Sequence, residues 1–268
     1  MRFTLRQIVV ASLSAAVGCR GGDNTSSASA QGIGDTIGMA RRAPVIAKPS
    51  TPYRVANVVD GGRLSGTVSF SGTPQGDTIV IVPADQNGCG KPLTIRRLER
   101  RNGKVANALV WITDVRSGRA LPTDQRFNLE NDDCAWTPVI QGVTAGGAIN
   151  VTNSDPLAER AYITDVASGD TVTVAPFTDD GQLIPYDKLI ASPGVHEFSV
   201  ESRPMSRAWV AAFDHPYFAV TDANGSFSID GIPAGTYHVR AWHPMLGATD
   251  GTVTIAANGT ANTDLNFH

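Results

Sequence analysis

The stretch WVAAFDHPYFAVTDANGSFSIDGIPAGTYHVRAWHP, residues 209–244, decides the fold. Apolar and polar side chains alternate over Phe218–Val220, Phe227–Ile229 and Tyr237–Ala241, and a period of two is typical of strands with one buried face. Between the first two segments, Asn224-Gly225 suits the positive φ angles of a tight hairpin. The stretch therefore predicts three β-strands joined by short turns.

The composition extends this prediction to the whole chain. Its 268 residues include 27 Gly and 16 Pro with few helix-period segments, which favours an all-β fold rich in turns. The net charge of -3 gives no general attraction to nucleic acid or acidic lipid. The sequence has no G-x-S-x-G, H-E-x-x-H or G-x-x-x-x-G-K-[ST] motif, so we expect no enzyme activity.

The amino terminus predicts export. Arg2 and Arg6 precede an apolar run at residues 8–17 that is too short to span a bilayer but suits a signal peptide, assigned to residues 1–19. The run ends in AVGC, which resembles a bacterial lipobox and implies lipidation of Cys19. Cleavage with simple secretion is the alternative. No aspartate follows Cys19, which favours the outer membrane over the inner one for a lipid-anchored protein.

Residues 20–59 are small, polar and rich in Gly, Ser and Ala. Such a segment buries too little apolar surface to order itself, so we expect a flexible linker. Docking of Val55–Val59 as an edge strand is the alternative.

Cys89 and Cys134 remain as an even pair in an oxidising space, which predicts a disulfide between them. The competing metal site lacks a C-x-x-C spacing or a nearby His.

The pattern TD-x-x-G-x-F-x-I-x-x-x-P-x-G-x-Y at Thr221–Tyr237 resembles carboxypeptidase regulatory-like domains, which are small transthyretin-like β-sandwiches. Gly66–Gly72 and Asn107–Val110 resemble the first half of the same domain. We therefore expect one sandwich split between residues 60–124 and 214–268, because a small sandwich needs all its strands to bury both inner faces.

Residues 125–213 resemble a cupredoxin-like domain of the plastocyanin type, inserted between these halves. The resemblance implies copper ligands at Glu159, Val200, Arg203 and Ser206, and none of these side chains matches the family's His, Cys, His and Met. A blue-copper centre needs a thiolate and two imidazoles, so we expect no copper and no other cofactor. We expect Glu159 and Arg203 to form an ion pair near the surface, worth about 0–1 kcal/mol.

Two pairs of residues offer other sites. His215 and His243 could share a metal at one end of the first sandwich, but each precedes a Pro and is expected to pack with its ring bonded to backbone. Trp209 and Trp242 could form a sugar-stacking platform, but their alternating patterns favour core or domain-interface packing.

Together these features predict a non-enzymatic protein of the bacterial cell envelope, on the periplasmic side and anchored to the membrane by lipid or secreted. We expect a binding or structural role, such as an accessory subunit that docks on a partner protein through exposed strand edges. Carbohydrate binding and a residual metal or redox role are the alternatives.

Overall fold

The computed structural model describes residues 46, 51–73, 79–122, 126–177, 181–186 and 191–268, without the side chains of 172–175 and 186. The predicted signal peptide, the lipidation of Cys19 and most of the predicted linker lie outside the described residues. Among the described residues the structure is β throughout apart from the single-turn helix α1 (Ala84–Asn87), which confirms the all-β fold class. Within them, no helix is both long and apolar enough to cross a membrane.

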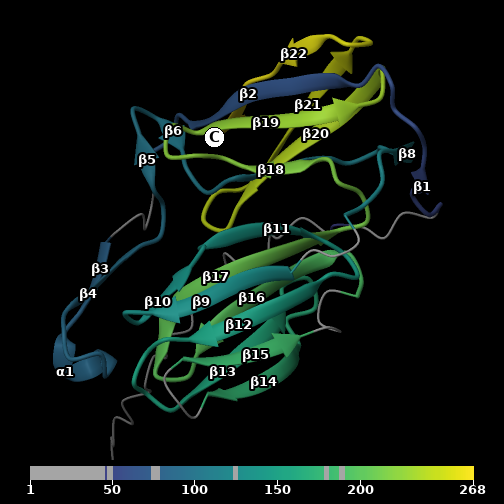
Figure 1. Cartoon of the computed structure of the whole chain (residues 1–268). Helices are drawn as coiled ribbons and strands as arrows, with labels where there is room; N and C mark the ends of the chain where they lie inside the picture. Colours follow the sequence, from purple (N-terminus) through teal and green to yellow (C-terminus); the bar gives the residue numbers. More distant parts are fainter. Residues whose placement is uncertain (1–45, 47–50, 74–78, 123–125, 178–180, 187–190) are drawn as a thin grey trace, which may run out of the picture. The chain divides into compact units, whose positions relative to one another are not determined.

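The first sandwich contains two sheets, and each combines blue to teal strands from the first part of the chain with green to yellow strands from the last part (Figure 1). One sheet has the order β18-β7-β20-β21, and the other has the order β19-β2-β6-β5 with β22 and β23 also paired to β2. The bounds are β2 (Gly62–Phe70), β5 (Arg100–Arg101), β6 (Lys104–Val105), β7 (Leu109–Ile112), β18 (Phe218–Val220), β19 (Ser226–Ile232), β20 (Gly235–His243), β21 (Gly247–Ile255), β22 (Thr260–Asn262) and β23 (Leu265–Phe267).

The core of this sandwich is built from two distant parts of the chain. Leu64, Val110 and Ile112 from the first part pack with Val239 and Ala241 from the second, and all are fully buried. Each inner face alone would leave apolar surface in water, so neither half forms a core without the other.

The second sandwich lies between these parts in the chain. One sheet has the order β10-β9-β12-β15 and the other β11-β17-β16-β13-β14. The bounds are β9 (Arg126–Asp132), β10 (Ala135–Thr137), β11 (Ile140–Thr144), β12 (Ala148–Asn153), β13 (Glu159–Asp165), β14 (Thr171–Phe177), β15 (Gln182–Tyr186), β16 (Gly194–Val200) and β17 (Arg203–Phe213).

The core of the second sandwich takes all its residues from a continuous segment. Leu129, Ile149, Ile163, Phe198 and Val210 are fully buried in it. The chain therefore leaves the first sandwich, builds a complete second core, and returns at β18.

A third cluster joins the two sandwiches. Leu109 of β7 and Trp242 of β20 are buried together with Ile140 of β11 and Ala211 and Phe213 of β17. Because β17 turns Val210 and Ala212 toward the second core and Ala211 and Phe213 toward this cluster, one strand serves both.

The three strands predicted from residues 209–244 are present as β18, β19 and β20, but the predicted hairpin is wrong. The turn itself forms, with Gly225 at φ 71° and the Asp222 carboxylate accepting the N–H groups of Asn224 and Ser226. However, β18 pairs with β7 whereas β19 pairs with β2. The turn therefore crosses between sheets instead of joining neighbouring strands.

The predicted linker, residues 20–59, extends too far toward the carboxyl terminus, because its last part is folded. Arg54 and Val55 form β1 (Arg54–Val55), which pairs in parallel with β8 (Ser117–Gly118), and the Tyr53 hydroxyl donates to the Arg119 carbonyl at 2.8 Å. The edge-strand alternative describes this part of the chain better, because Tyr53 also packs against the first core.

Two further strands form an arm that belongs to neither sandwich. β3 (Ile79–Val82) and β4 (Leu93–Arg96) pair with each other in a two-stranded sheet, and α1 lies between them. We call residues 79–96 the arm, and Figure 1 shows it at the left with α1 at its lower end.

Substitution of Gly66 in β2 tests how tightly the first sandwich is packed. A Cβ at this position would lie 1.7 Å from the Thr263 carbonyl oxygen, which is backbone and cannot turn aside. We expect Gly66→Ala to lower the free energy of unfolding in urea by about 3 kcal/mol through overpacking. The control is Gly194→Ala, whose Cβ would meet its nearest neighbour, the Asp165 carboxylate, at 3.7 Å. Equal losses in both variants would contradict this account.

Candidate functional site

The four positions at which the resemblance implies copper ligands lie at one end of the second sandwich. Glu159 begins β13, Val200 ends β16, Arg203 begins β17 and Ser206 follows within β17. Val200 and Arg203 are register partners across the turn at residues 201–202. The structure thus brings Glu159, Val200 and Arg203 together, whereas Ser206 lies three residues further along β17. Val200 is 1% exposed and belongs to the apolar core.

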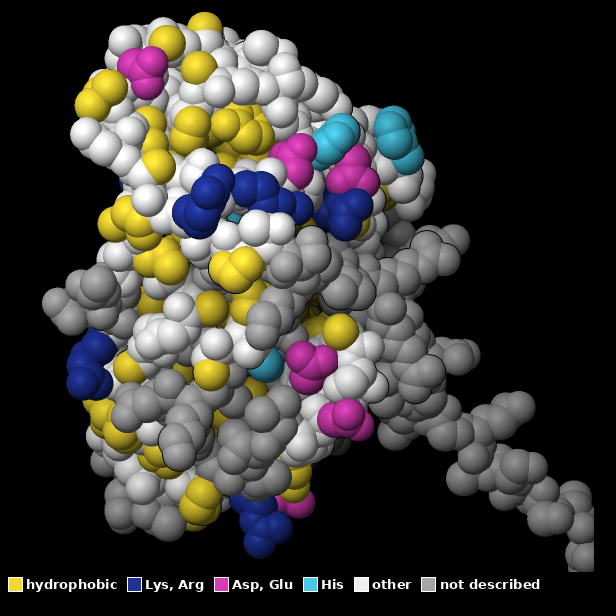
Figure 2. All heavy atoms as spheres, turned by 90° about the vertical axis from the view of Figure 1, so that its right-hand side faces the viewer, with side chains coloured by type: hydrophobic (Ala, Val, Ile, Leu, Met, Phe, Trp, Pro, Cys, Tyr) yellow, Lys and Arg dark blue, Asp and Glu magenta, His cyan; other side chains and the backbone are white. Residues whose placement is uncertain are grey.

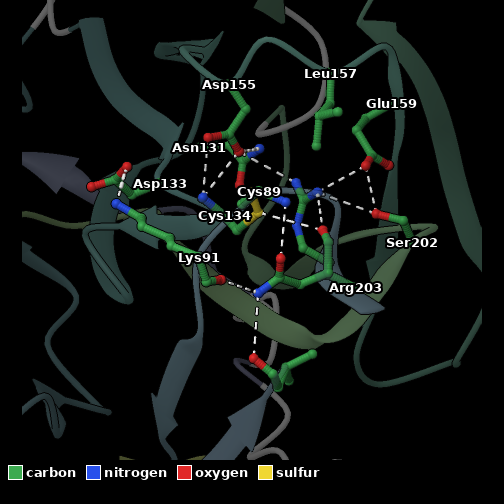
Figure 3. Close-up of a disulfide and its surroundings, with 12 residues drawn as sticks. Cys89, Lys91, Asn131, Asp133, Cys134, Asp155, Leu157, Glu159, Ser202 and Arg203 are labelled. Atoms are coloured by element: carbon green, nitrogen blue, oxygen red, sulfur yellow. Dashed lines mark hydrogen bonds and ion pairs between the residues drawn. A yellow bond between two sulfur atoms is a disulfide. The ribbon is translucent and has the colours of Figure 1, made fainter. Parts of the chain in front are cut away.

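Arg203 and Glu159 form the predicted ion pair. Arg203 Nη1 lies 2.8 Å from Glu159 Oε1, and the Ser202 hydroxyl donates to the same carboxylate (Figure 3). The expected position near the surface is wrong, since the two side chains are only 2% and 6% exposed. A buried pair has lost its hydration, so its removal on one side is far more costly than at a surface.

Asp155 is a second carboxylate on the same guanidinium, and its role was not predicted. Asp155 Oδ2 lies 3.4 Å from Arg203 Nη2, and the carboxylate accepts hydrogen bonds from the Cys134 N–H at 3.1 Å and the Asn131 amide at 2.9 Å. Burial raises the pKa of Asp155, and the Cys134 N–H and Arg203 oppose that rise. Arg203 therefore holds Glu159 closely and Asp155 more loosely.

Buried amides complete the network. Asn131 donates to Asn153 Oδ1 at 3.1 Å, and Asn153 donates to the carbonyl groups of Asp155 and Leu157. Asn131 and Asn153 are fully buried, and they fix the loop that carries Asp155. The signal for this part was the sequence Asn153-Ser154-Asp155-Pro156, whose amide and carboxylate are two residues apart on a strand end.

The arm covers this end of the sandwich. The Asn87 carbonyl accepts from Arg203 Nη1 at 3.4 Å, and the Asn87 side chain bonds the arm's own backbone at Cys89 and Lys91. The predicted disulfide between Cys89 and Cys134 is present and ties the arm to the turn after β9. In Figure 3 the disulfide lies beside Arg203, between Asp155 and the arm.

These residues offer poor ligands for a metal. Among the described residues, Cys89, Cys134 and Asp155 place one donor atom each within 4.8 Å of one another, but both sulfur atoms are used in the disulfide. The four implied positions supply a carboxylate, an isopropyl group, a guanidinium and a hydroxyl instead of the thiolate and imidazoles of a blue-copper centre. The carboxylate of Glu159 is already neutralised by Arg203.

The rings of His215 and His243 bond the backbone, as predicted. His215 Nδ1 accepts the N–H of Tyr217 and His243 Nδ1 accepts the N–H of Met245, both at 3.2 Å. In each His-Pro-X sequence the ring thus bonds the backbone two residues on. Burial lowers the pKa of His215 to about 4 and that of His243 to about 3.

These shifts predict a loss of stability in acid. A histidine whose folded pKa lies below its unfolded pKa stabilises the fold fully above pH 6.5 and loses that contribution as the pH falls toward the folded value. Between pH 6 and 5, His215→Gln should reduce the slope of unfolding free energy against pH by about 1.4 kcal/mol per unit. The unchanged protein, measured in parallel, provides the reference slope. An unchanged slope in His215→Gln would show that His215 is not held neutral.

The tryptophans do not form an exposed platform. Trp242 is 1% exposed within the cluster that joins the sandwiches, and Trp209 packs against that cluster. This confirms the packing interpretation for both side chains.

Comparison with known proteins agrees with the carboxyl-terminal motif. Residues 199–268 match the family described as carboxypeptidase regulatory-like domain. The match begins within β16, earlier than the predicted boundary at residue 214. No curated protein matches the sequence.

Several solved structures of copper proteins are similar to part of the chain. Amicyanin from Paracoccus versutus is 14% identical over 35% of this chain and 85% of its own, with a TM-score of 0.28. A purple cupredoxin from Nitrosopumilus maritimus is 15% identical over 34% of this chain and 100% of its own, with a TM-score of 0.28. A copper-containing nitrite reductase from Thermus scotoductus is 14% identical over 35% of this chain and 24% of its own, with a TM-score of 0.30.

Proposed function

We propose that the protein is a non-enzymatic component of the bacterial cell envelope that binds a partner protein as an accessory subunit. The observation that carries this proposal concerns the end of the second sandwich at which the resemblance implies copper ligands, which we call the ligand end. Arg203, Glu159 and Asp155 fill it with a buried ion network, and the disulfide-anchored arm covers it. A site filled in this way favours a scaffold role over metal chemistry.

Exposed strand edges supply the means of binding. Within the described residues, β14, β15 and β21 end their sheets, and the arm has two free edges. An edge strand presents unpaired N–H and C=O groups, to which an extended partner segment can add. Lipidation at Cys19, proposed from the sequence, would hold the protein on the periplasmic face of a membrane, with the outer membrane favoured.

Chemical crosslinking of the full-length protein in intact envelopes tests the proposal. We expect one reproducible crosslinked protein whose recovery does not depend on added metal. Crosslinks spread over many abundant proteins would contradict the accessory-subunit role. Specific binding of the full-length protein to a glycan array would instead favour carbohydrate recognition.

A further inference from the structure

A cavity of about 370 Å³ lies where the two sandwiches meet. Arg119 after β8, Pro216 before β18 and Phe218 of β18 line it from the first sandwich. Phe127 of β9 and Thr144 of β11 line it from the second. Small-molecule sites are commonly cavities of about 300–1,000 Å³ at the interface of two domains. This cavity is separate from the ligand end, since none of its lining residues belongs to the ion network there.

The walls of the cavity are mainly apolar and are held in place by packing. The half-buried ring of Phe218 stacks on the ring of Phe213, with 4.6 Å between the ring centroids. A Cβ at Gly142 would lie 2.6 Å from the Phe218 ring, so this ring rests directly on the backbone of β11. Phe127 packs against the second core. Because both phenyl rings are already ordered, little conformational entropy is lost when a ligand covers them.

Arg119 brings a positive charge without a counter-charge to this cavity. Its Nη2 donates to the Pro216 carbonyl at 2.9 Å, and its guanidinium carbon lies 5.5 Å from the centre of the Tyr217 ring. Among the described residues, no carboxylate forms an ion pair with Arg119 and no acidic side chain lines the cavity. The guanidinium has five N–H donors in a planar fork, so donors remain for a planar anion.

The side of the molecule that carries Arg119 combines basic and hydrophobic side chains. β8, which ends one residue before Arg119, lies at the right of Figure 1, the side that Figure 2 turns toward the viewer. There, a row of basic side chains crosses the middle of the face, with hydrophobic side chains above and below it (Figure 2). A ligand that is anionic at one end and apolar at the other suits such a surface.

Thr144 adds a second polar group to the cavity. Ile140 packs in the cluster between the sandwiches and Val143 in the second core, so the alternation of β11 turns Thr144 toward the first sandwich. The residue is only 3% exposed, and its hydroxyl makes no hydrogen bond with another described residue. A hydroxyl on so buried a residue is stabilised by a ligand that exchanges a hydrogen bond with it.

We propose that this cavity binds a small monocarboxylate with an apolar or aromatic body. The carboxylate pairs with Arg119, the body covers the rings of Phe127 and Phe218, and Thr144 supplies a further hydrogen bond. One guanidinium matches one negative charge, and within the described residues the walls hold no second cation for a dianion. The inference goes beyond the accessory-subunit role and does not depend on it.

Titration calorimetry on the full-length protein tests the inference. The probes are phenylpropionate and hexanoate at concentrations up to about 10 mM, and the matched neutral probe is phenylpropionamide. We expect both acids to bind, and the amide to bind at least about tenfold more weakly than phenylpropionate. Arg119→Gln should weaken binding of the acids about tenfold and remove the preference over the amide, whereas Arg119→Lys should keep this preference. The control is Arg116→Gln, an exposed arginine outside the cavity walls, which should leave binding unchanged.

Four results would overturn the inference. They are no binding of either acid, equal binding of the acid and the amide to the unchanged protein, equal weakening by Arg119→Gln and Arg116→Gln, and tighter binding of phenyl phosphate than of phenylpropionate. Urea unfolding of each variant shows whether its fold is intact. If Arg119→Gln is destabilised, Thr144→Val provides the test, since it keeps the shape of the side chain and should still weaken binding of both acids. Unchanged binding in Thr144→Val would then reject the cavity as the site.

Discussion

Replacing Arg203 by methionine is expected to lower the free energy of unfolding by about 3–5 kcal/mol, because two buried carboxylates would lose their shared counter-charge. Glu159 and Asp155 both lie within 3.4 Å of the guanidinium, and neither side chain is more than 6% exposed. Chemical denaturation of Arg203→Met beside the unchanged protein measures the loss.

The surface pair Arg240 and Asp250 provides the matched control. Its side chains are 33% and 58% exposed, so Arg240→Met should cost at most about 1 kcal/mol. A triple variant that combines Arg203→Met with Glu159→Leu and Asp155→Asn should recover much of the stability, because no charge is then left buried. Equal losses of unfolding free energy for Arg203→Met and Arg240→Met would mean that water reaches the ion network around Arg203.

Loss of the disulfide is expected to have a similarly large effect. Cys89 and Cys134 are 45 positions apart, and closure of a loop of that length stabilises by about 4 kcal/mol on the chain-entropy estimate. Cys89→Ser with Cys134→Ser should therefore lower the unfolding free energy by about that amount. Hydrogen exchange should also increase in the arm before it increases in the fully buried strand β7.

Reductant provides the control for this prediction. It should reproduce the loss in the unchanged protein and have no effect on the double serine variant. If reductant does not lower the unfolding free energy of the unchanged protein, the arm is held by its hydrogen bonds and not by the disulfide.

The strands could be predicted from the sequence because alternation of apolar residues is a local property. The pairing of those strands could not. β18 and β19 are separated by a turn that Asp222 and Gly225 stabilise, yet their partners β7 and β2 lie more than a hundred residues earlier in the chain. Which sheet a strand joins depends on those distant partners, and turn chemistry does not reveal them.

The candidate site, too, could be predicted from the sequence only in part. The alignment with the implied copper-ligand positions predicted an ion pair between Arg203 and Glu159, and this pair is present. The burial of this ion pair depends on Asn131, Asp155 and Asn87, which come from β9, the loop after β12 and α1. Nothing in the sequence of the arm indicates that it covers one end of the second sandwich. The end of the linker was missed because Arg54 and Val55 form a strand too short to give a periodic pattern.

Copper loading of the full-length protein tests the central claim most directly. We propose that the ligand end of the second sandwich is filled by a buried ion network and is not a metal centre. Protein stripped with chelator, incubated with copper(II) and desalted should retain no stoichiometric copper and show no blue charge-transfer absorption. One copper per chain with that absorption would contradict the account, because it would require a thiolate ligand where the structure has the Cys89–Cys134 disulfide and Val200.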